Sequence, residues 1–414
     1  MASLLRPVRP ALVTLTALTA LAALAACSSG DPSAPPGQEP LDGGAETPDA
    51  GGPIDDPTDA GVPGPVVTLG PPDYIDLGAV PATFDLEVPA GTLGFSFDTN
   101  GVAVNRVTDA AGTSYVPGDR PAELREEYRR LTRFPASSTM LAIPSGTWTI
   151  ELAGPANVKV ARQRTNDGQF HGGTLDLHVH LPVGLHVGDF ITGEAPPDAV
   201  TPANAAANPV VTKFLDAFFV QLKRVVGIDR GAVTFVEADA KFVTMDSEDE
   251  VKEAYRVAGT LSKDEQFGLH MIFTELIQTP DVLGLAPITG GIGYDRPFAT
   301  AIVKMKDQKP PGTDPAPHIA EGHGPGDLSA GIALHETFHL WGIPHTSEEG
   351  SATYDDGFTD TASCTTVTTN PFTCPDNTNV VFPRPVRAIG KASLSPHQLA
   401  VIRGAAVYRP KLAP

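Results

Sequence analysis

His335, His339 and His345 constrain this chain more than any other feature of its sequence. His335 and His339 are four residues apart, so on an α-helix their ring nitrogens lie on one face and can converge on one metal ion. Gly342 can adopt the left-handed conformation that ends a helix, which lets the chain turn back and present His345 as a third ligand. Glu336 follows the first ligand and could act as a general base on water at the metal. The spacing predicts a zinc site with a fourth position open to water.

The surrounding residues indicate a buried helix that presents this site. Asp327 or Ser329 can cap its N-terminus. Leu334, Phe338 and Trp341 recur at helical spacing and predict an apolar stripe that faces the core, with the ligands on the other face.

Every specified position of the motif HExxHxxGxxH is matched from His335 to His345, and the chain therefore resembles the metzincin metallopeptidases. Downstream, residues 360–364, 374–377 and 379–383 look like the pappalysin-type (cytophagalysin-like) branch, in which a disulfide-bearing loop leads to a turn below the metal. The resemblance covers roughly residues 174–408. It implies an α+β zincin domain with a twisted mixed sheet, an active-site helix, one catalytic zinc ion and hydrolysis of peptide bonds with Glu336 as the base.

The sequence departs from the family in the turn beneath the metal. Metzincins carry a methionine there, whereas all five methionines of this chain precede the motif, and Val381, or with less support Val380, takes the place. The family's methionine is an apolar floor and not a ligand, so valine could serve with altered packing. No tyrosine follows the turn at short range, and no tyrosine is therefore assigned to the transition state.

The first 26 residues have the pattern of an export signal. Arg6 and Arg9 precede an apolar run over residues 11–23, which is short for a membrane span, and the run ends in Leu24-Ala25-Ala26-Cys27. This resembles a bacterial lipoprotein signal, so Cys27 is expected to be the lipid-modified first residue of the mature chain. The alternative is a simple secretory signal that happens to precede a cysteine. Serines after Cys27 favour the outer membrane if the cell has two membranes.

The charge and composition of the chain exclude some classes of binding partner. Cleavage after residue 26 removes Arg6 and Arg9, so the formal charge would fall from -20 to -22. Phosphates would be repelled, which argues against a nucleic-acid partner and leaves a peptide or protein substrate. Residues 27–65 comprise the anchor and an acidic, Pro- and Gly-rich segment that cannot fold alone, and we expect a flexible tether to the membrane. The protein is expected to be a monomer.

With Cys27 assigned to lipid, Cys364 and Cys374 remain, and an exported protein favours a disulfide between them. In the chain-entropy model a loop this short stabilises the fold by about 2 to 3 kcal/mol. A second metal site at these cysteines lacks enough soft ligands.

Residues 66–162 are predicted to form a small β-sandwich. Residues 84–88, 93–97 and 147–152 alternate between apolar and polar side chains, and Asn100-Gly101 is a hairpin-type turn. Residues 121–133 favour a short exposed helix, with a cleavage-prone loop as the alternative. No chemistry is visible here, so the region could be an accessory binding domain, a folding aid or a removable pro-segment.

Residues 163–414 are predicted to form the peptidase domain. Strands are expected at 174–181, 232–237 and 269–277. A helix is expected at 209–226, with Asn208 as cap and Gly227 past its end, and a second helix runs to about residue 258 from a capping box at Ser247 and Glu250. A final helix is expected from Ser395 to Arg403.

The strand before the active-site helix is predicted to be the edge along which an extended substrate pairs. We place it at Ala299, Thr300, Ala301, Ile302 and Val303, with Gly290 and Gly291 as the entry turn.

Three weaker groups have other candidate roles. His178 and His180 share a strand face near His186 and could bind a second metal, although they lack partner carboxylates at a recognised spacing. His318 and His323 could line the cleft or be solvated loop residues. Asp355, Asp356 and Asp360 could hold Ca²⁺ in an irregular loop, with ordinary surface acids as the default.

Together these features predict a lipid-anchored, extracytoplasmic zinc endopeptidase. A surface-binding lipoprotein with a structural or vestigial zinc site is the main alternative, supported by Val381 and opposed by the intact Glu336. A zinc amidase that acts on cell-wall peptides would share the metal chemistry and differ in its pocket.

Overall fold

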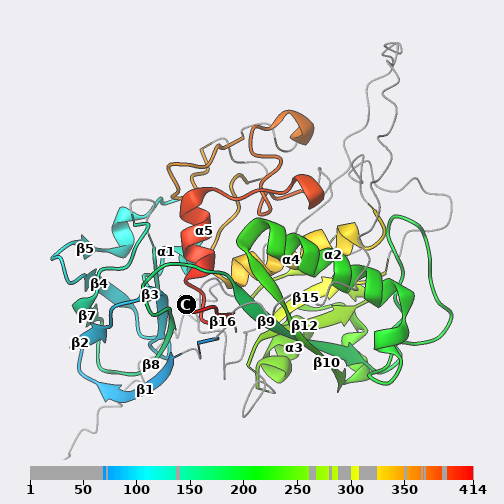
Figure 1. Cartoon of the computed structure of the whole chain (residues 1–414), viewed down its shortest axis with the longest axis horizontal. Coiled ribbons are helices and arrows are strands. Elements are labelled where there is room, and N and C mark those ends of the chain that lie inside the picture. The colour runs from blue at the N-terminus through cyan, green and yellow to red at the C-terminus, as the bar shows by residue number, and fades with distance from the viewer. Residues whose placement is uncertain are drawn as a thin grey trace, which may run out of the picture.

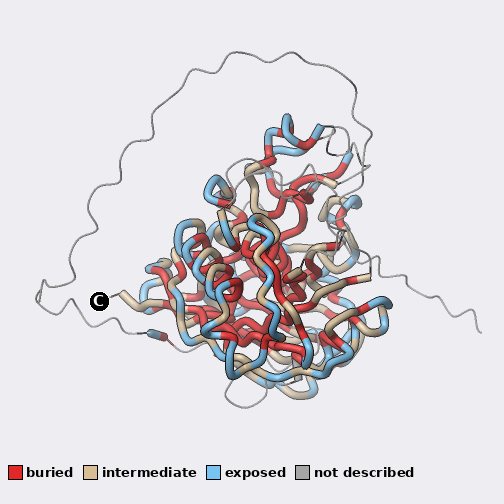
Figure 2. The backbone as a smooth tube through the Cα atoms, turned by 90° about the vertical axis from the view of Figure 1, so that its right-hand side faces the viewer, coloured by how far each residue is buried: buried red, intermediate tan, exposed pale blue. Residues whose placement is uncertain are grey.

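The computed structural model describes residues 69–70, 73–136, 140–260, 267–278, 282–287, 300–306, 324–348, 351, 353–364, 367, 370–384 and 389–413. It is a mixed α and β structure with several sheets, in agreement with the predicted class. A β lobe and a larger lobe of helices and strands lie side by side, with the C-terminal segment between them (Figure 1). Buried backbone runs through the middle of the molecule (Figure 2). The predicted signal, Cys27 and the tether lie outside the described residues, and none of the described helices is long and apolar enough to cross a bilayer.

The β lobe consists of two four-stranded antiparallel sheets. The first has the order β1 (Asp73–Val80), β8 (Ala156–Arg164), β3 (Thr92–Asp98), β6 (Arg133–Phe134), and the second β2 (Thr83–Val88), β7 (Gly146–Leu152), β4 (Val104–Thr108), β5 (Ser114–Tyr115). Both sheets contribute to one apolar core, in which Phe95 of the first lies edge-on to Trp148 of the second with ring centroids 5.1 Å apart. The two sheets therefore enclose this core between them.

The turn at Asn100-Gly101 differs from the prediction. Both residues have positive φ, 52° and 87°, as a tight turn of this type requires. The flanking strands β3 and β4, however, belong to different sheets and do not pair with each other. The turn therefore carries the chain across the sandwich and does not close a hairpin.

A mixed sheet forms the centre of the larger lobe. Its order is β10 (Ile228–Ala238), β9 (Gly173–Pro182), β12 (Leu269–Thr274), β15 (Thr300–Lys304), β14 (Gly284–Leu285), and β16 (Arg409–Pro410) also pairs with β9. The strands β9, β10, β12 and β15 run parallel, whereas β14 and β16 are antiparallel to their neighbours. Helices cover both faces, which explains why β9, β12 and β15 are almost entirely buried.

Two layers of helices enclose this sheet. On one face, α2 (Pro209–Val226) and α4 (Asp327–Leu340) share a core with alternate residues of the strands, and on the other α3 (Glu248–Thr260) packs on Ile272 and Ile302. A last helix, α5 (Pro396–Arg403), packs against β3 of the β lobe. The short elements are η1 (Pro117–Asp119), α1 (Glu126–Arg129), η2 (Ala205–Ala207), η3 (Ala240–Phe242), β11 (Thr244–Met245), β13 (Leu276–Ile277), η4 (Pro371–Thr373) and η5 (Ile389–Lys391).

The predicted substrate edge is wrong by one strand. The strand β15 begins at Thr300, and it is flanked by β12 on one side and by β14 on the other, where Gly284 pairs with Val303. Within the part of the chain that the structure describes, β14 is thus the outermost strand on this side. Ala299, Gly290 and Gly291 lie outside the described residues.

Several helix ends follow the predicted signals, and one does not. Asn208 accepts hydrogen bonds from Val210 and Val211 at the start of α2, and Gly227 ends that helix with a φ of 90°. The start of α4, in contrast, is not capped by Asp327 or Ser329: its N-cap residue is Gly326, whose amide donates to Asp189 from a distant loop at 2.5 Å. A hydrogen bond to a distant loop and packing of the buried helix, and not a local side-chain cap, fix this end.

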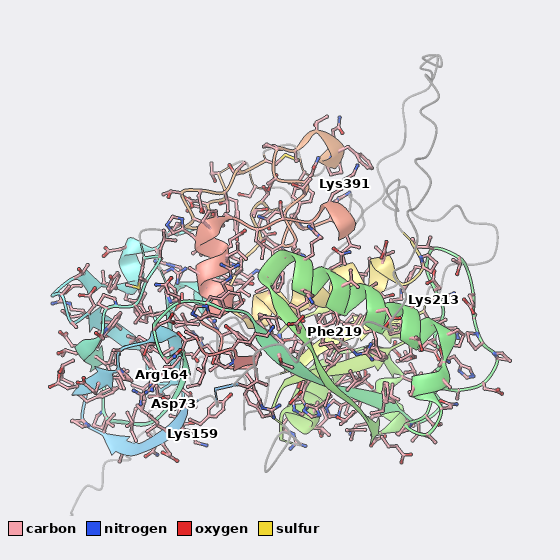
Figure 3. The ribbon with its side chains drawn as sticks, in the orientation of Figure 1. Asp73, Lys159, Arg164, Lys213, Phe219 and Lys391 are labelled. Carbon is pink, nitrogen blue, oxygen red and sulfur yellow. A yellow bond between two sulfur atoms is a disulfide. The ribbon has the colours of Figure 1, made fainter. Side chains whose placement is uncertain are left out.

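The lobes are joined through the C-terminal segment. Gly94 of β3 and Gly404 after α5 approach so closely that a Cβ atom on Gly94 would lie 2.5 Å from the Cα atom of Gly404. Gln163 of β8 donates to the carbonyl oxygen of Tyr408 at 2.9 Å. Ion pairs such as Arg164 with Asp73, 3.3 Å apart, lie instead on the outer surface (Figure 3).

Candidate metal centre

Three buried imidazoles converge at the C-terminal end of α4. His335 and His339 lie one turn apart on this helix, and Gly342, with a φ of 109°, turns the chain so that His345 faces them. The Nε2 atom of His335 is 2.9 Å from Nε2 of His339 and 3.1 Å from Nε2 of His345. The structure therefore brings together the three residues that the spacing predicts.

The opposite nitrogen of each ring has its own acceptor. Nδ1 of His335 lies 2.9 Å from the carbonyl oxygen of Val380, Nδ1 of His339 lies 2.7 Å from that of Ile343, and Nδ1 of His345 lies 2.9 Å from the Glu348 carboxylate. Because carbonyl and carboxylate oxygens only accept, each Nδ1 must carry the proton. The Nε2 lone pairs then point at one another, which is unfavourable unless a cation lies between them.

Burial keeps these imidazoles in the form that binds a metal. Desolvation lowers the pKa of His335 to about 3 and that of His339 well below its ordinary value, so both rings are neutral near neutral pH. Among the described residues, no fourth His, Cys, Asp or Glu joins this group. Three neutral nitrogen ligands fit a metal cation with an open position.

Glu336 is buried beside the ligands, and burial raises the pKa of its carboxyl group well above the ordinary value. A bound cation would favour the carboxylate form, so metal binding and loss of this proton are coupled. The outer strand β14 passes directly over the group: a Cβ atom on Gly284 would lie 2.7 Å from Oε1 of Glu336. Glycine at this position leaves room for the carboxyl group.

The turn that contains Val381 supports two of the ligands through its backbone. Val380 accepts from His335, and the carbonyl oxygen of Val381 accepts from the amide of Thr346, next to His345, at 3.4 Å. The side chain of Val381 is fully buried in the core shared with α4. The turn thus lies against His335 and the segment that carries His345, with valine in its apolar interior.

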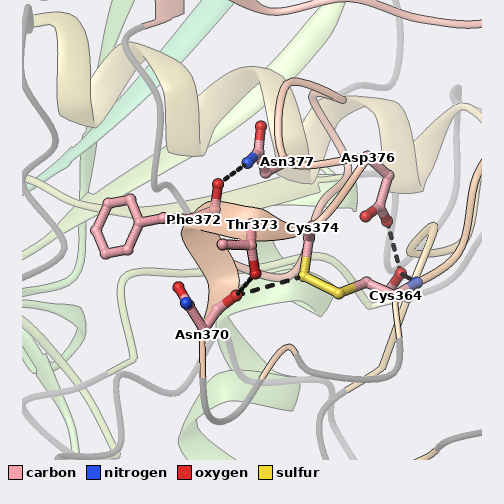
Figure 4. Close-up of a disulfide and its surroundings, with 8 residues drawn as sticks. Cys364, Asn370, Phe372, Thr373, Cys374, Asp376 and Asn377 are labelled. Atoms are coloured by element: carbon pink, nitrogen blue, oxygen red, sulfur yellow. Dashed lines mark hydrogen bonds between the residues drawn. A yellow bond between two sulfur atoms is a disulfide. The ribbon is translucent and has the colours of Figure 1, made fainter.

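Cys364 and Cys374 form the predicted disulfide (Figure 4). The amide of Cys364 donates to Oγ of Ser347 at 2.8 Å, and this hydroxyl donates to Asp376 at 2.6 Å. Ser347 lies two residues after His345 in the chain. The bridged loop therefore braces the segment that carries the third ligand.

Two further groups at the site were not predicted. Tyr128, in the β lobe, places its hydroxyl 3.0 Å from Nδ1 of His339, and the neighbouring Arg125 is close enough to lower the pKa of Glu336 against the larger effect of burial. The segment 121–133 is thus a wall of the metal centre and not merely an exposed helix. Glu348 could have been suspected, because it is an acid three residues after a ligand, but no sequence signal marks Tyr128.

The weaker candidates have structural partners. His178 and His180 of β9 stack on His270 of β12, with ring centroids 4.7 and 5.2 Å apart, while His186 contacts Glu275 at 3.4 Å. Within the described ranges these histidines form no metal-binding group. His318 and His323 lie outside the described residues.

The proposed calcium ligands also have other roles. Asp356 accepts from the hydroxyl of Thr361 at 2.8 Å, and Asp360 accepts from Ser395 at the start of α5, also at 2.8 Å. Asp355 accepts from the amide of Gly357 at 2.7 Å. In the described part of the chain these acids do not gather as a cation site.

Comparison with known proteins does not assign the chain to a family. No protein-family model matches the chain, and no curated protein matches it. Among solved structures, archaemetzincin from Methanopyrus kandleri aligns with 57% of this chain and 89% of its own, at 14% sequence identity and a TM-score of 0.25. A TM-score this low does not establish a shared fold, so the function has to be inferred from the residues of the site.

Proposed function

We propose that this chain is a zinc endopeptidase of the metzincin type, in which His335, His339 and His345 hold the metal and Glu336 is the general base. One observation supports this most directly: three Nε2 atoms face one point while every Nδ1 atom is held by an acceptor. Imidazole ligands suit zinc, and three protein ligands are typical of catalytic rather than structural zinc sites.

The chain's own residues account for the proton transfers. Zinc, when bound, supplies Lewis acidity that makes water easier to deprotonate near neutral pH and polarises a carbonyl oxygen. Glu336 takes the proton from the attacking water and returns it to the leaving amine. Its burial between α4 and β14 excludes bulk solvent from this exchange.

The outer strand supports a peptide substrate. An extended chain that pairs with β14 would run beside Gly284 and therefore beside the carboxyl group of Glu336. Gly284 has no side chain to hold the substrate away from this group. We propose β14, in place of the strand at 299–303, as the strand with which the substrate pairs.

The cellular setting belongs to the same proposal. The signal pattern before Cys27 supports export and lipid anchoring, at the outer membrane where the cell has two, with residues 27–65 as a tether. The segments at 360–364, 374–377 and 379–383 support the pappalysin-like branch. The enzyme would act as a monomer on peptides or proteins outside the cytoplasm, with no nucleic-acid partner.

A binding protein with a vestigial zinc site is the second candidate. It is favoured by Val381 in place of the family's methionine. A zinc amidase would use the same residues on cell-wall peptides.

The test is to measure bound zinc in the chain from residue 66 onward and to assay a diverse peptide library, cell-wall peptides included, with and without chelator. We expect one zinc ion per chain and chelator-sensitive cleavage. Glu336→Gln should keep its zinc and lose about 10²- to 10⁴-fold in rate, the usual contribution of a general base. Zinc without any cleavage would favour the binding protein, and activity unaffected by Glu336→Gln would refute the mechanism.

A further inference from the structure

A segment of the β lobe reaches across to the metal centre of the other lobe. The hydroxyl of Tyr128, in α1, lies 3.0 Å from Nδ1 of His339, a residue 211 positions later in the chain. The two rings meet edge to face, with centroids 6.2 Å apart and an interplanar angle of 67°. A ligand of the site therefore contacts a domain that the motif itself does not include.

Contacts of Arg133 hold the segment of Tyr128 in place. Arg133, five residues after Tyr128, is buried and donates through Nη2 to the carbonyl oxygen of Val401 in α5 at 2.7 Å. It also packs on the turn that follows the second ligand: a Cβ atom on Gly342 would lie 2.6 Å from Cδ of Arg133. Tyr128, Arg133 and Gly342 line one pocket together. The segment is thus fastened to the turn between His339 and His345.

The hydroxyl of Tyr128 is placed to support His339 as a metal ligand. Nδ1 of His339 has two oxygen neighbours, the carbonyl of Ile343 at 2.7 Å and the hydroxyl of Tyr128 at 3.0 Å. The carbonyl can only accept, so it fixes the proton on Nδ1 and leaves Nε2 free to bind a metal, and the hydroxyl can then accept from the same N–H group. The tyrosine ring also limits rotation of the imidazole, because it lies against the imidazole's edge.

We propose that Tyr128 is a positioning residue for His339, so that the β lobe contributes a supporting side chain to the metal centre. The inference rests on the metal site of the proposed function, but it does not depend on which substrate the protein cleaves. It assigns to the β lobe a task that its sequence does not reveal.

The test compares Tyr128→Phe with Tyr74→Phe in the same chain. Tyr74 donates its hydroxyl to the carbonyl of Ala406, so its variant also loses a hydrogen bond between the lobes but leaves the ligands untouched. Zinc affinity is measured by competition with a chromophoric chelator, and the ligand geometry by the visible absorption spectrum after Co²⁺ substitution. Thermal unfolding of the metal-free proteins shows whether both variants fold equally well.

We expect Tyr128→Phe to weaken zinc binding by about tenfold, the lower end for loss of a ligand's supporting partner, because Ile343 still accepts from His339. Its Co²⁺ spectrum should change, whereas Tyr74→Phe should match the parent in both measurements. Equal zinc affinity and equal spectra for the two variants would overturn the inference while leaving the metal site intact. A parent chain that binds no zinc would instead refute the proposed function itself.

Discussion

Glu348 holds the third histidine of the metal centre: its Oε1 atom lies 2.9 Å from Nδ1 of His345. The other two ligands donate to backbone carbonyl oxygens, of Val380 and Ile343, which a side-chain substitution does not remove, whereas the Glu348 carboxylate can be removed by substitution. The carboxylate fixes the tautomer of the imidazole and makes its other nitrogen a stronger electron donor.

Replacing Glu348 should therefore loosen the metal. We expect Glu348→Ala to weaken zinc binding by about 10- to 100-fold, and Glu348→Gln to have a smaller effect because its amide oxygen can still accept. Competition with a chelator measures both. Glu253→Ala is the control, because Glu253 is paired with Arg256 on α3, on the opposite face of the sheet. Equal affinities for all three variants would contradict the role of Glu348.

Gly284 should be required for turnover and not for metal binding. Its added Cβ atom would lie 2.7 Å from Oε1 of Glu336 and 2.6 Å from Cγ2 of Ile332, so Gly284→Ala must displace the carboxyl group or the strand. We expect a fall of at least about tenfold in kcat, a part of what a general base contributes, with zinc still bound. Peptide cleavage and zinc content measure the two effects.

Gly154→Ala is the matched control for this substitution, because no atom lies within 4 Å of the added Cβ there. An alanine at position 284 that leaves kcat at the parent's value would show that Glu336 does not need the space above it.

The buried histidines predict a loss of stability in acid. Burial lowers the pKa of His180 to about 3, whereas an unfolded histidine titrates near its ordinary value of 6.5. Between these values the unfolded chain binds a proton that the folded chain does not. The free energy of unfolding should therefore fall as the pH drops from 6.5 toward 3, by up to about 1.4 kcal/mol per pH unit for this residue. Above pH 6.5 the titration of His180 should not affect the free energy of unfolding.

Denaturant unfolding of the metal-free protein at pH 7.5 and 4.5 measures this effect. His335 and His339 act in the same direction, so the contribution of His180 is read from the difference between the parent and His180→Leu. The variant should lose less stability on acidification than the parent does. An identical loss in both proteins would show that His180 is not kept neutral by the fold.

Local signals were enough to predict much of the fold. The helix α2 begins and ends where Asn208, Pro209 and Gly227 predict, because each of these residues acts on the backbone within one turn. The capping box of Ser395 and Gln398 at α5 is also present. The three histidines of the candidate metal centre could be predicted for the same reason. They lie within one helix and the turn that follows it, so no distant segment is needed to bring them together.

Features that depend on distant segments were missed. The position of β15 inside the sheet depends on the two-residue strand β14, whose pairing no local pattern specifies. The start of α4 is held by Asp189, 137 residues away, and not by a neighbouring side chain. Tyr128 meets His339 only because the β lobe folds back against the turn at Gly342. The spacing of residues in the sequence does not predict such contacts.

The pairing of β16 with β9 has a consequence for the order of folding. Arg409 contacts the carboxylate of Asp176 at 2.5 Å, which joins residues 233 positions apart, and contacts of such long range slow folding because the ends of a long loop must first be brought together. The central sheet of the larger lobe is therefore incomplete until residues 409 and 410 pair with β9. A chain that stops short of residue 409 would lack this neighbour of β9 and the contact between Arg409 and Asp176, and we expect it to unfold more readily than one that includes these residues.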